Sequence, residues 1–143
     1  MGSFKYIHNN EKMMLKDKKR KRELLLEMQN TPMIVRIDRP TKLARAKLLG
    51  YKAKQGYIVL RVRVSKGGFR RPRPVHARRP SKTGLYFNLA ISKQKMAEQR
   101  AFRYYRNMEV VGSYLLVGNG KYNWFSIMLL LLHPIGRTAP KFW

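Results

Sequence analysis

The sequence predicts an α+β domain, because helical and strand patterns occur side by side along one short chain. With 143 residues, 44% of them hydrophobic, the chain can bury one core of modest size, and we do not expect two large independent domains. Apolar residues recur at helical spacing in two long stretches, whereas residues 57–64 alternate as a strand does. Near the end, Asn119-Gly120 separates two apolar runs as hairpin turns do. We therefore expect a single domain over residues 1–143.

The first helix is expected over residues 9–29 and is strongly basic. Its apolar residues include Met13 and Met28, and Asn30-Thr31-Pro32 ends it. The run KDKKRKR at residues 16–22 interrupts the apolar pattern. Such a run can be a solvated helix face, but in a chain of net charge +25 we favour contact with phosphate groups.

A short strand, MIVRI at residues 33–37, and a second helix follow. The segment RPTKLARAKLLG predicts Thr41 as the helix N-cap and Gly50 as the residue that ends the helix. Its leucines and alanines form a packing stripe. Three cations are left outside that stripe: Lys42, Arg45 and Lys47.

The strand YIVLRVRV at residues 57–64 places different side chains on its two faces, because successive side chains point in opposite directions. One face carries Ile58, Leu60, Val62 and Val64. The other carries Val59, Arg61 and Arg63. We expect the first face to close the core and the second to meet a polyanion or water.

Residues 65–84 predict an extended basic arm. They are rich in glycine and proline and contain seven Lys and Arg residues. Proline removes backbone donors and glycine raises the entropy cost of order, so this arm should not fold on itself and should become ordered only on a partner.

The last third of the chain predicts a strand or irregular apolar segment, a helix and a hairpin. LYFNLAIS at residues 85–92 is the apolar segment, and Ser92 can cap a helix that runs to about Arg106. The hairpin should have a type I′ turn at Asn119-Gly120, which supplies the positive φ angles that this turn needs.

The charge distribution indicates a polyanionic partner. Lys and Arg number 32 and Asp and Glu 7, and residues 39–97 contain 17 cations without any acid. Soluble surfaces usually mix both signs, so this window suggests a face that meets phosphate. The apolar run at residues 124–132 is far shorter than the roughly 20 residues of a membrane-spanning helix, so we expect no membrane partner.

Catalytic and metal-binding signatures are weak. There is no cysteine, the three histidines are scattered, and the seven acids do not form a cluster. We expect no enzymatic activity and no cofactor, with any structural Mg²⁺ held by RNA rather than by protein side chains.

Candidate RNA-binding residues are the cations of the basic segments and one aromatic residue. Phe69 has no core available to it and is the best candidate for stacking on a base. The full set is Lys18, Lys19, Arg20, Lys21, Arg22, Lys42, Arg45, Lys52, Lys54, Arg61, Arg63, Lys66, Phe69, Arg70, Arg71, Arg73, Arg78, Arg79 and Lys82.

The segment RPTKLARAKLLGYKAKQGYIVLRVRVSKGGFRRPRP closely resembles the signature of the large-subunit ribosomal protein L15e family, of archaeal and eukaryotic type. MGSFKYI and MAEQRAFRYYRNMEVVGSYLLVGNGKYNWFSIMLLLLHP resemble the start and second half of that family. The resemblance implies a small, mostly antiparallel sheet flanked by helices. It also implies a non-enzymatic constituent of the cytoplasmic ribosome that contacts large-subunit rRNA and neighbouring ribosomal proteins and forms no homo-oligomer.

The sequence departs from the family pattern in its last strand and beyond. Ser126 and Leu132 stand where the family usually has Glu and Asp. The family's long basic tail does not follow GRTAPKFW, so either this lineage lost the tail or the chain is a piece of a longer one.

Two other functions remain open from the sequence alone. A free-standing basic RNA-binding protein or RNA chaperone would carry the same charge without being a stoichiometric ribosome component. A small nuclease would need an acid cluster, which the sequence lacks.

Overall fold

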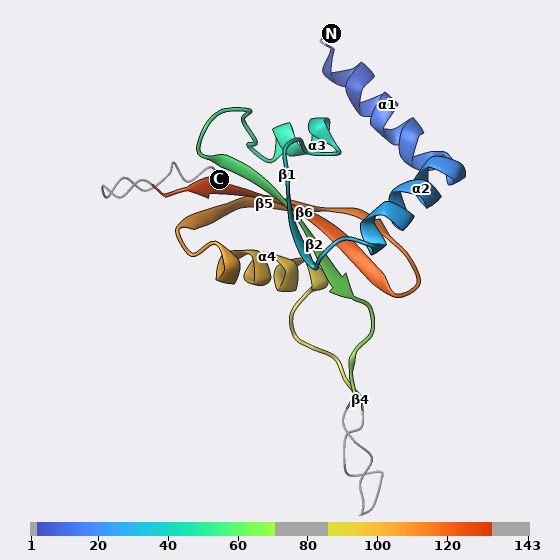
Figure 1. Cartoon of the computed structure of the whole chain (residues 1–143), viewed down its shortest axis with the longest axis vertical. Helices are drawn as coiled ribbons and strands as arrows, with labels where there is room; N and C mark the ends of the chain where they lie inside the picture. Colours follow the sequence, from blue (N-terminus) through green and yellow to red (C-terminus); the bar gives the residue numbers. More distant parts are fainter. Residues whose placement is uncertain (1–2, 71–85, 133–143) are drawn as a thin grey trace, which may run out of the picture.

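The computed structural model describes residues 3–70 and 86–132. Its elements, in chain order, are α1 (Phe4–Lys16), α2 (Lys18–Gln29), β1 (Ile34–Ile37), α3 (Leu43–Leu48), β2 (Tyr57–Ser65), β3 (Phe69–Arg70), β4 (Tyr86–Phe87), α4 (Lys93–Tyr104), β5 (Met108–Gly118) and β6 (Tyr122–Leu131). Figure 1 shows the helices arranged around one sheet, with the β3–β4 ribbon projecting away from it.

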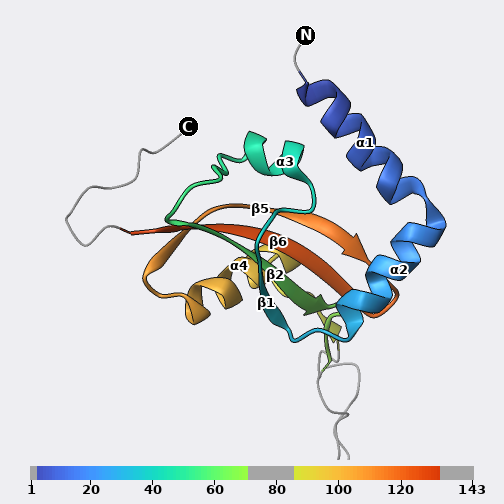
Figure 2. The same ribbon diagram turned by 45° about the horizontal axis from the view of Figure 1, so that its top comes forward.

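The main sheet is antiparallel throughout and has the strand order β1-β2-β6-β5. The long strands β2 and β6 lie at its centre, with Arg61 opposite Ser126 and Arg63 opposite Trp124. Figure 2 shows these strands crossing the middle of the molecule. The predicted α+β class with a small antiparallel sheet is confirmed.

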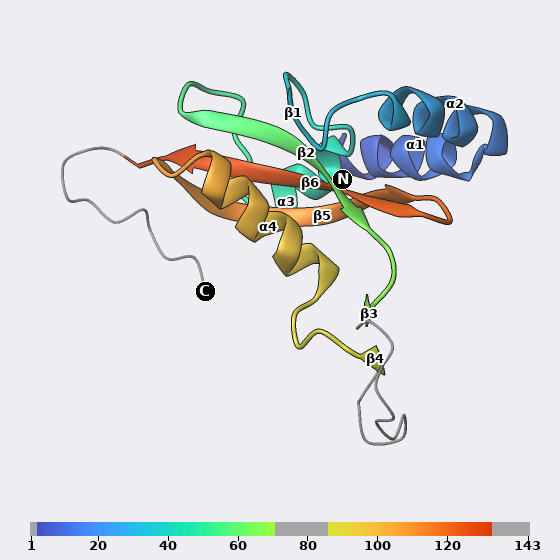
Figure 3. The same ribbon diagram turned by 60° about the horizontal axis from the view of Figure 1, so that its bottom comes forward.

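Both faces of the sheet are covered by helices, as Figure 3 shows, with α4 on one side and α2 on the other. Under α4, apolar β2 and β6 side chains such as Leu60 and Ile127 pack with Ala97 and Ala101. The other face has a second core. It contains Met28 of α2, Ala46 of α3, and Val59, Tyr114, Leu116, Val117, Trp124 and Met128 of the sheet.

The basic N-terminal segment forms two helices rather than the single helix expected over residues 9–29. Helix α1 already begins at Phe4, and α2 starts after Asp17. Asp17 has extended backbone angles, and its carboxylate accepts a hydrogen bond of 3.0 Å from the Lys19 N–H. The bend therefore arises because an aspartate N-cap ends one helix and starts the next.

Helix α3 is capped from outside its own segment. Thr41 is not its N-cap, because Lys42 occupies that position and makes no side-chain capping bond. Instead, Glu11 of α1 accepts a hydrogen bond of 2.9 Å from the Ala44 N–H. At the other end, Gly50 has a φ of +90°, which glycine adopts without strain, so its predicted role in ending the helix is confirmed.

The start of the last helix agrees with the prediction, whereas the turn of the last hairpin differs from it. Ser92 accepts a hydrogen bond of 3.1 Å from the Lys95 N–H and starts α4 as predicted. The β5–β6 hairpin is also confirmed, but the type I′ turn is wrong, because Gly120 does not have a positive φ. The Asn119 side chain makes the turn instead, accepting from the Lys121 and Tyr122 N–H groups at 2.9 and 2.6 Å.

The predicted arm at residues 65–84 begins with regular structure. Ser65 completes β2, and Phe69-Arg70 pair with Tyr86-Phe87 as a two-stranded antiparallel ribbon. Aromatic residues favour strands, which accounts for the pairing at this position. The expectation that the arm becomes ordered only on a partner does not hold for Phe69-Arg70, and residues 71–84 lie outside the described part of the chain.

Candidate nucleic-acid interface

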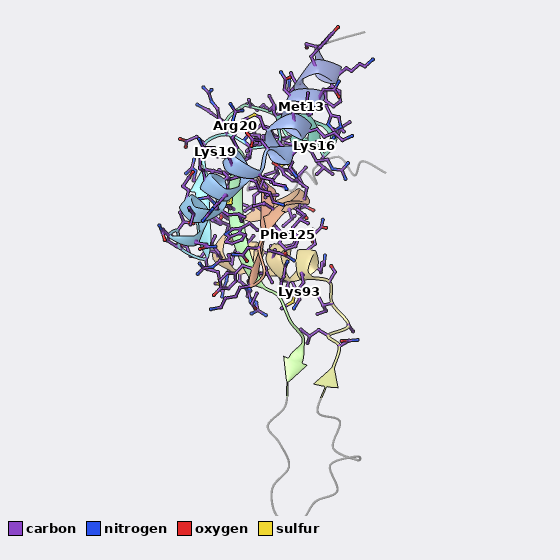
Figure 4. The ribbon with its side chains drawn as sticks, turned by 90° about the vertical axis from the view of Figure 1, so that its right-hand side faces the viewer. Met13, Lys16, Lys19, Arg20, Lys93 and Phe125 are labelled. Atoms are coloured by element: carbon purple, nitrogen blue, oxygen red, sulfur yellow. The ribbon has the colours of Figure 1, made fainter. Side chains whose placement is uncertain are left out.

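The cations of α2 form an exposed basic surface. All five predicted contacts of this helix, Lys18, Lys19, Arg20, Lys21 and Arg22, are exposed. The second half of the helix packs on the sheet through Leu24, Leu25 and Met28. Figure 4 shows Lys19 and Arg20 near the bend, away from the core residue Phe125. The first half of the helix is therefore charged and exposed all round, and its second half packs on the sheet.

Arg61 does not reach this surface. Its side chain lies on the face of β2 that α2 covers, and the residue is only 8% exposed. Its Nη2 is 3.5 Å from the Thr31 Oγ1, and its Nε has no hydrogen-bond partner among the described residues. The prediction that Arg61 meets a polyanion or water is wrong, because a second core forms on this part of the β2 face.

Arg63 is partly exposed and contacts the end of α2. Its Nη1 donates a hydrogen bond of 3.2 Å to the Gln29 carbonyl, and its guanidinium lies 4.8 Å from the centre of the Tyr122 ring. Helix α2 has no basic residue in its last turn, where cations stabilise unpaired carbonyls. Arg61 and Arg63 therefore supply from the sheet the positive charge that the helix end lacks.

The remaining predicted contacts lie in different parts of the molecule. Lys52 and Lys54 are exposed in the loop before β2, and Lys66 is exposed just after it. The backbone of Phe69 and Arg70 lies in β3. Five further predicted residues fall outside the described chain: Arg71, Arg73, Arg78, Arg79 and Lys82.

A pocket of about 560 Å³ lies between α1, α3 and the edge of β5. It brings the predicted contacts Lys42 and Arg45 together with Lys12 and Lys16 of α1, which are absent from the predicted set. The spacing of Lys12 and Lys16 places both on one face of a helix. The sequence could therefore have shown that Lys12 and Lys16 share a helix face. Nothing in the sequence indicated that α3 would lie opposite these two lysines.

Burial changes the chemistry of two residues beside this pocket. Lys42 is half-buried, and its pKa is lowered mainly by loss of solvation and also by the charge of Arg45, although Glu11 opposes the shift. Its Nζ donates a hydrogen bond of 3.0 Å to the Leu115 carbonyl. Burial also raises the pKa of the Tyr114 phenol, whose oxygen accepts from the Lys42 N–H at 3.3 Å.

Metal and membrane sites are absent from the part of the chain that the structure describes. Over residues 3–70 and 86–132, no group of three or more His, Cys, Asp or Glu side chains could hold a metal ion. Within the same ranges, no helix has the length and apolar character needed to cross a bilayer.

The family comparison decides the identity of this basic α+β domain. The family model described as Ribosomal L15 matches residues 2–135, which is nearly the whole chain. The chain belongs to this family. The resemblance expected from the central motif is therefore confirmed.

Membership of the Ribosomal L15 family has direct consequences for the class of protein. The family consists of structural ribosomal proteins, so the chain is of a ribosomal and ribonucleoprotein class, associated with the large subunit and with translation. Such proteins associate with rRNA and with other ribosomal proteins. The basic surfaces described above are the parts of this chain that offer chemistry for the RNA.

Proposed function

We propose that this protein binds and stabilises large-subunit rRNA as a non-catalytic constituent of the ribosome. Its contacts are made mainly by the exposed cations of α2, with further contacts from the loop cations Lys52 and Lys54 and from the basic arm. Phosphate neutralisation releases counterions, which supplies affinity without sequence reading.

The observation that carries this proposal is the construction of α2. Its five consecutive cations at residues 18–22 are exposed, while its C-terminal half is held by the sheet. A charged helix that is already fixed in position loses little entropy when it meets a phosphate backbone. Residues 18–22 therefore offer pre-positioned phosphate contacts.

The contact surface can be tested by removing charge from one side of α2. Lys18→Gln, Lys21→Gln and Arg22→Gln together remove three cations at helical spacing. The slope of log affinity for large-subunit rRNA against log salt should fall by roughly 0.7 to 0.9 for each phosphate that is no longer neutralised. The matched control is Lys5→Gln, Lys47→Gln and Arg103→Gln, which removes the same charge from exposed positions outside the predicted contacts.

The role in the ribosome needs a separate measurement. Tagged protein should sediment with large subunits in stoichiometric amount through high salt. Recovery in the soluble fraction, with RNA binding retained, would favour the alternative of a free-standing RNA-binding protein or chaperone. RNA cleavage that disappears on a point substitution would contradict the non-catalytic assignment.

A further inference from the structure

The pocket at the edge of β5 has the size of a ligand site. Its volume of about 560 Å³ lies within the range of roughly 300 to 1,000 Å³ typical of such sites. Helix α1 forms one wall, α3 another, and the edge of β5 the floor. The ionisable residues that line it are His8, Glu11, Lys12, Lys16, Lys42 and Arg45.

The charge in this pocket is strongly positive. Lys12 and Lys16 come from α1, and Lys42 and Arg45 from α3 and its N-cap. None of these four cations forms an ion pair with a carboxylate over residues 3–70 and 86–132. The one acid in the lining, Glu11, uses an oxygen to accept from the Ala44 N–H. An anion in the pocket would therefore meet several cations and one carboxylate that is already engaged.

Two carbonyls at the floor of the pocket already accept hydrogen bonds. Strand β5 is an edge strand, and its carbonyls could repel negative charge. The Ser113 carbonyl, however, accepts from the Gln94 side chain at 3.1 Å, and the Leu115 carbonyl accepts from Lys42 Nζ at 3.0 Å. Because an ammonium group has three donors, Lys42 can satisfy this carbonyl and still bind a ligand.

We propose that this pocket holds one phosphate group of the RNA backbone, bound between the cations of α1 and those of α3. The inference rests on the proposed function in that the phosphate belongs to rRNA. Arg45 suits a phosphate because its planar guanidinium can donate two parallel hydrogen bonds, while the lysines act as point charges. A bound anion would also offset the desolvation and the Arg45 repulsion that Lys42 experiences.

The test uses the whole protein and two small probes, of which only one contains a phosphodiester. Backbone amide signals of Ala44 and Leu115 are followed by NMR while the dinucleotide UpU or the nucleoside uridine is added. We expect saturable shifts with UpU and none with uridine. Lys12→Gln with Arg45→Gln should weaken UpU binding about tenfold or more, because charge-assisted hydrogen bonds are removed.

A matched control removes equal charge from the same two helices. Lys5 and Lys47 are exposed on α1 and α3 but do not line the pocket, so Lys5→Gln with Lys47→Gln should bind UpU as the parent does. Equal binding by both double variants would overturn the proposal. Saturable binding of a poly-glutamate peptide without any response to UpU would also overturn it, in favour of an acidic protein partner.

The same variants separate this inference from the proposed function. If the pocket variant sediments with large subunits and keeps the control's salt slope, the phosphate site is wrong and the ribosomal role stands. If the parent protein fails to sediment with large subunits, the ribosomal role fails, while the UpU titration still decides the pocket.

Discussion

The two faces of the central sheet come from the same strands but are filled with different chemistry. Under α4, the central strands β2 and β6 present an apolar face, with Leu60, Val62 and Ile127 fully buried. Under α2 and α3, the face also buries Arg61, and neither its Nε nor the Trp124 Nε1 has a hydrogen-bond partner among the described residues. Apolar burial stabilises a fold, whereas buried polar groups without partners cost stability.

This difference indicates a division of roles between the faces. The face under α4 supplies stability. The face under α2 and α3 is less stabilising, because it buries polar groups without partners. Its arginines contact Gln29 and Thr31, where the basic helix ends. We expect substitutions on the first face to unfold the domain and those on the second to affect mainly the position of α2.

The largest effect should come from the apolar face. Phe125 is 4% exposed in the core under α4, so Phe125→Ala should lower the free energy of unfolding by about 3 to 5 kcal/mol. Urea denaturation measures this change. Leu115→Ala, on the neighbouring strand but 49% exposed, is the control and should change stability by only about 0.5 kcal/mol.

Arg63→Gln tests the anchoring of α2. It removes the charged hydrogen bond to the Gln29 carbonyl and the interaction with the Tyr122 ring, and should cost about 1 to 2 kcal/mol. Because Arg63 acts on the helix end in this geometry, the salt slope of rRNA binding should stay unchanged. A fall of roughly 0.7 to 0.9 in that slope would show instead that Arg63 contacts phosphate.

Glu11→Ala tests the hydrogen bond that holds α1 to α3. It removes the acceptor of the Ala44 N–H, and removal of a helix cap costs about 1 kcal/mol. Hydrogen exchange at the Ala44 amide should become faster. Glu23→Ala, an exposed acid on α2, should leave that exchange rate as it is. Equal protection in both variants would mean that Glu11 does not cap α3 in solution.

The smallest effect is expected from Arg61→Met. Methionine fills a similar volume and removes a buried charge that lacks a carboxylate partner among the described residues, so relief of the desolvation cost should offset removal of the hydrogen bond to Thr31. The free energy of unfolding should change by about 1 kcal/mol or less. A decrease of more than about 2 kcal/mol would show that the guanidinium is well satisfied in solution.

Local patterns of the sequence determined much of this fold. The alternation in residues 57–64 predicted which β2 side chains pack under α4, and Ser92 predicted the start of a helix. The two apolar runs around Asn119-Gly120 predicted the hairpin, although not its turn. These features depend on periodicity and on short-range hydrogen bonds, and both are set by residues that are close together in the sequence.

Only the tertiary structure decided where the charged side chains lie. The alternation of β2 separates Arg61 from Leu60, but it cannot say that α2 will cover the arginine face and bury it. Likewise, Lys12 and Arg45 share a pocket because α1 packs beside α3, where Glu11 caps the helix. Burial and pKa depend on which distant elements meet, and that depends on packing between segments far apart in the sequence.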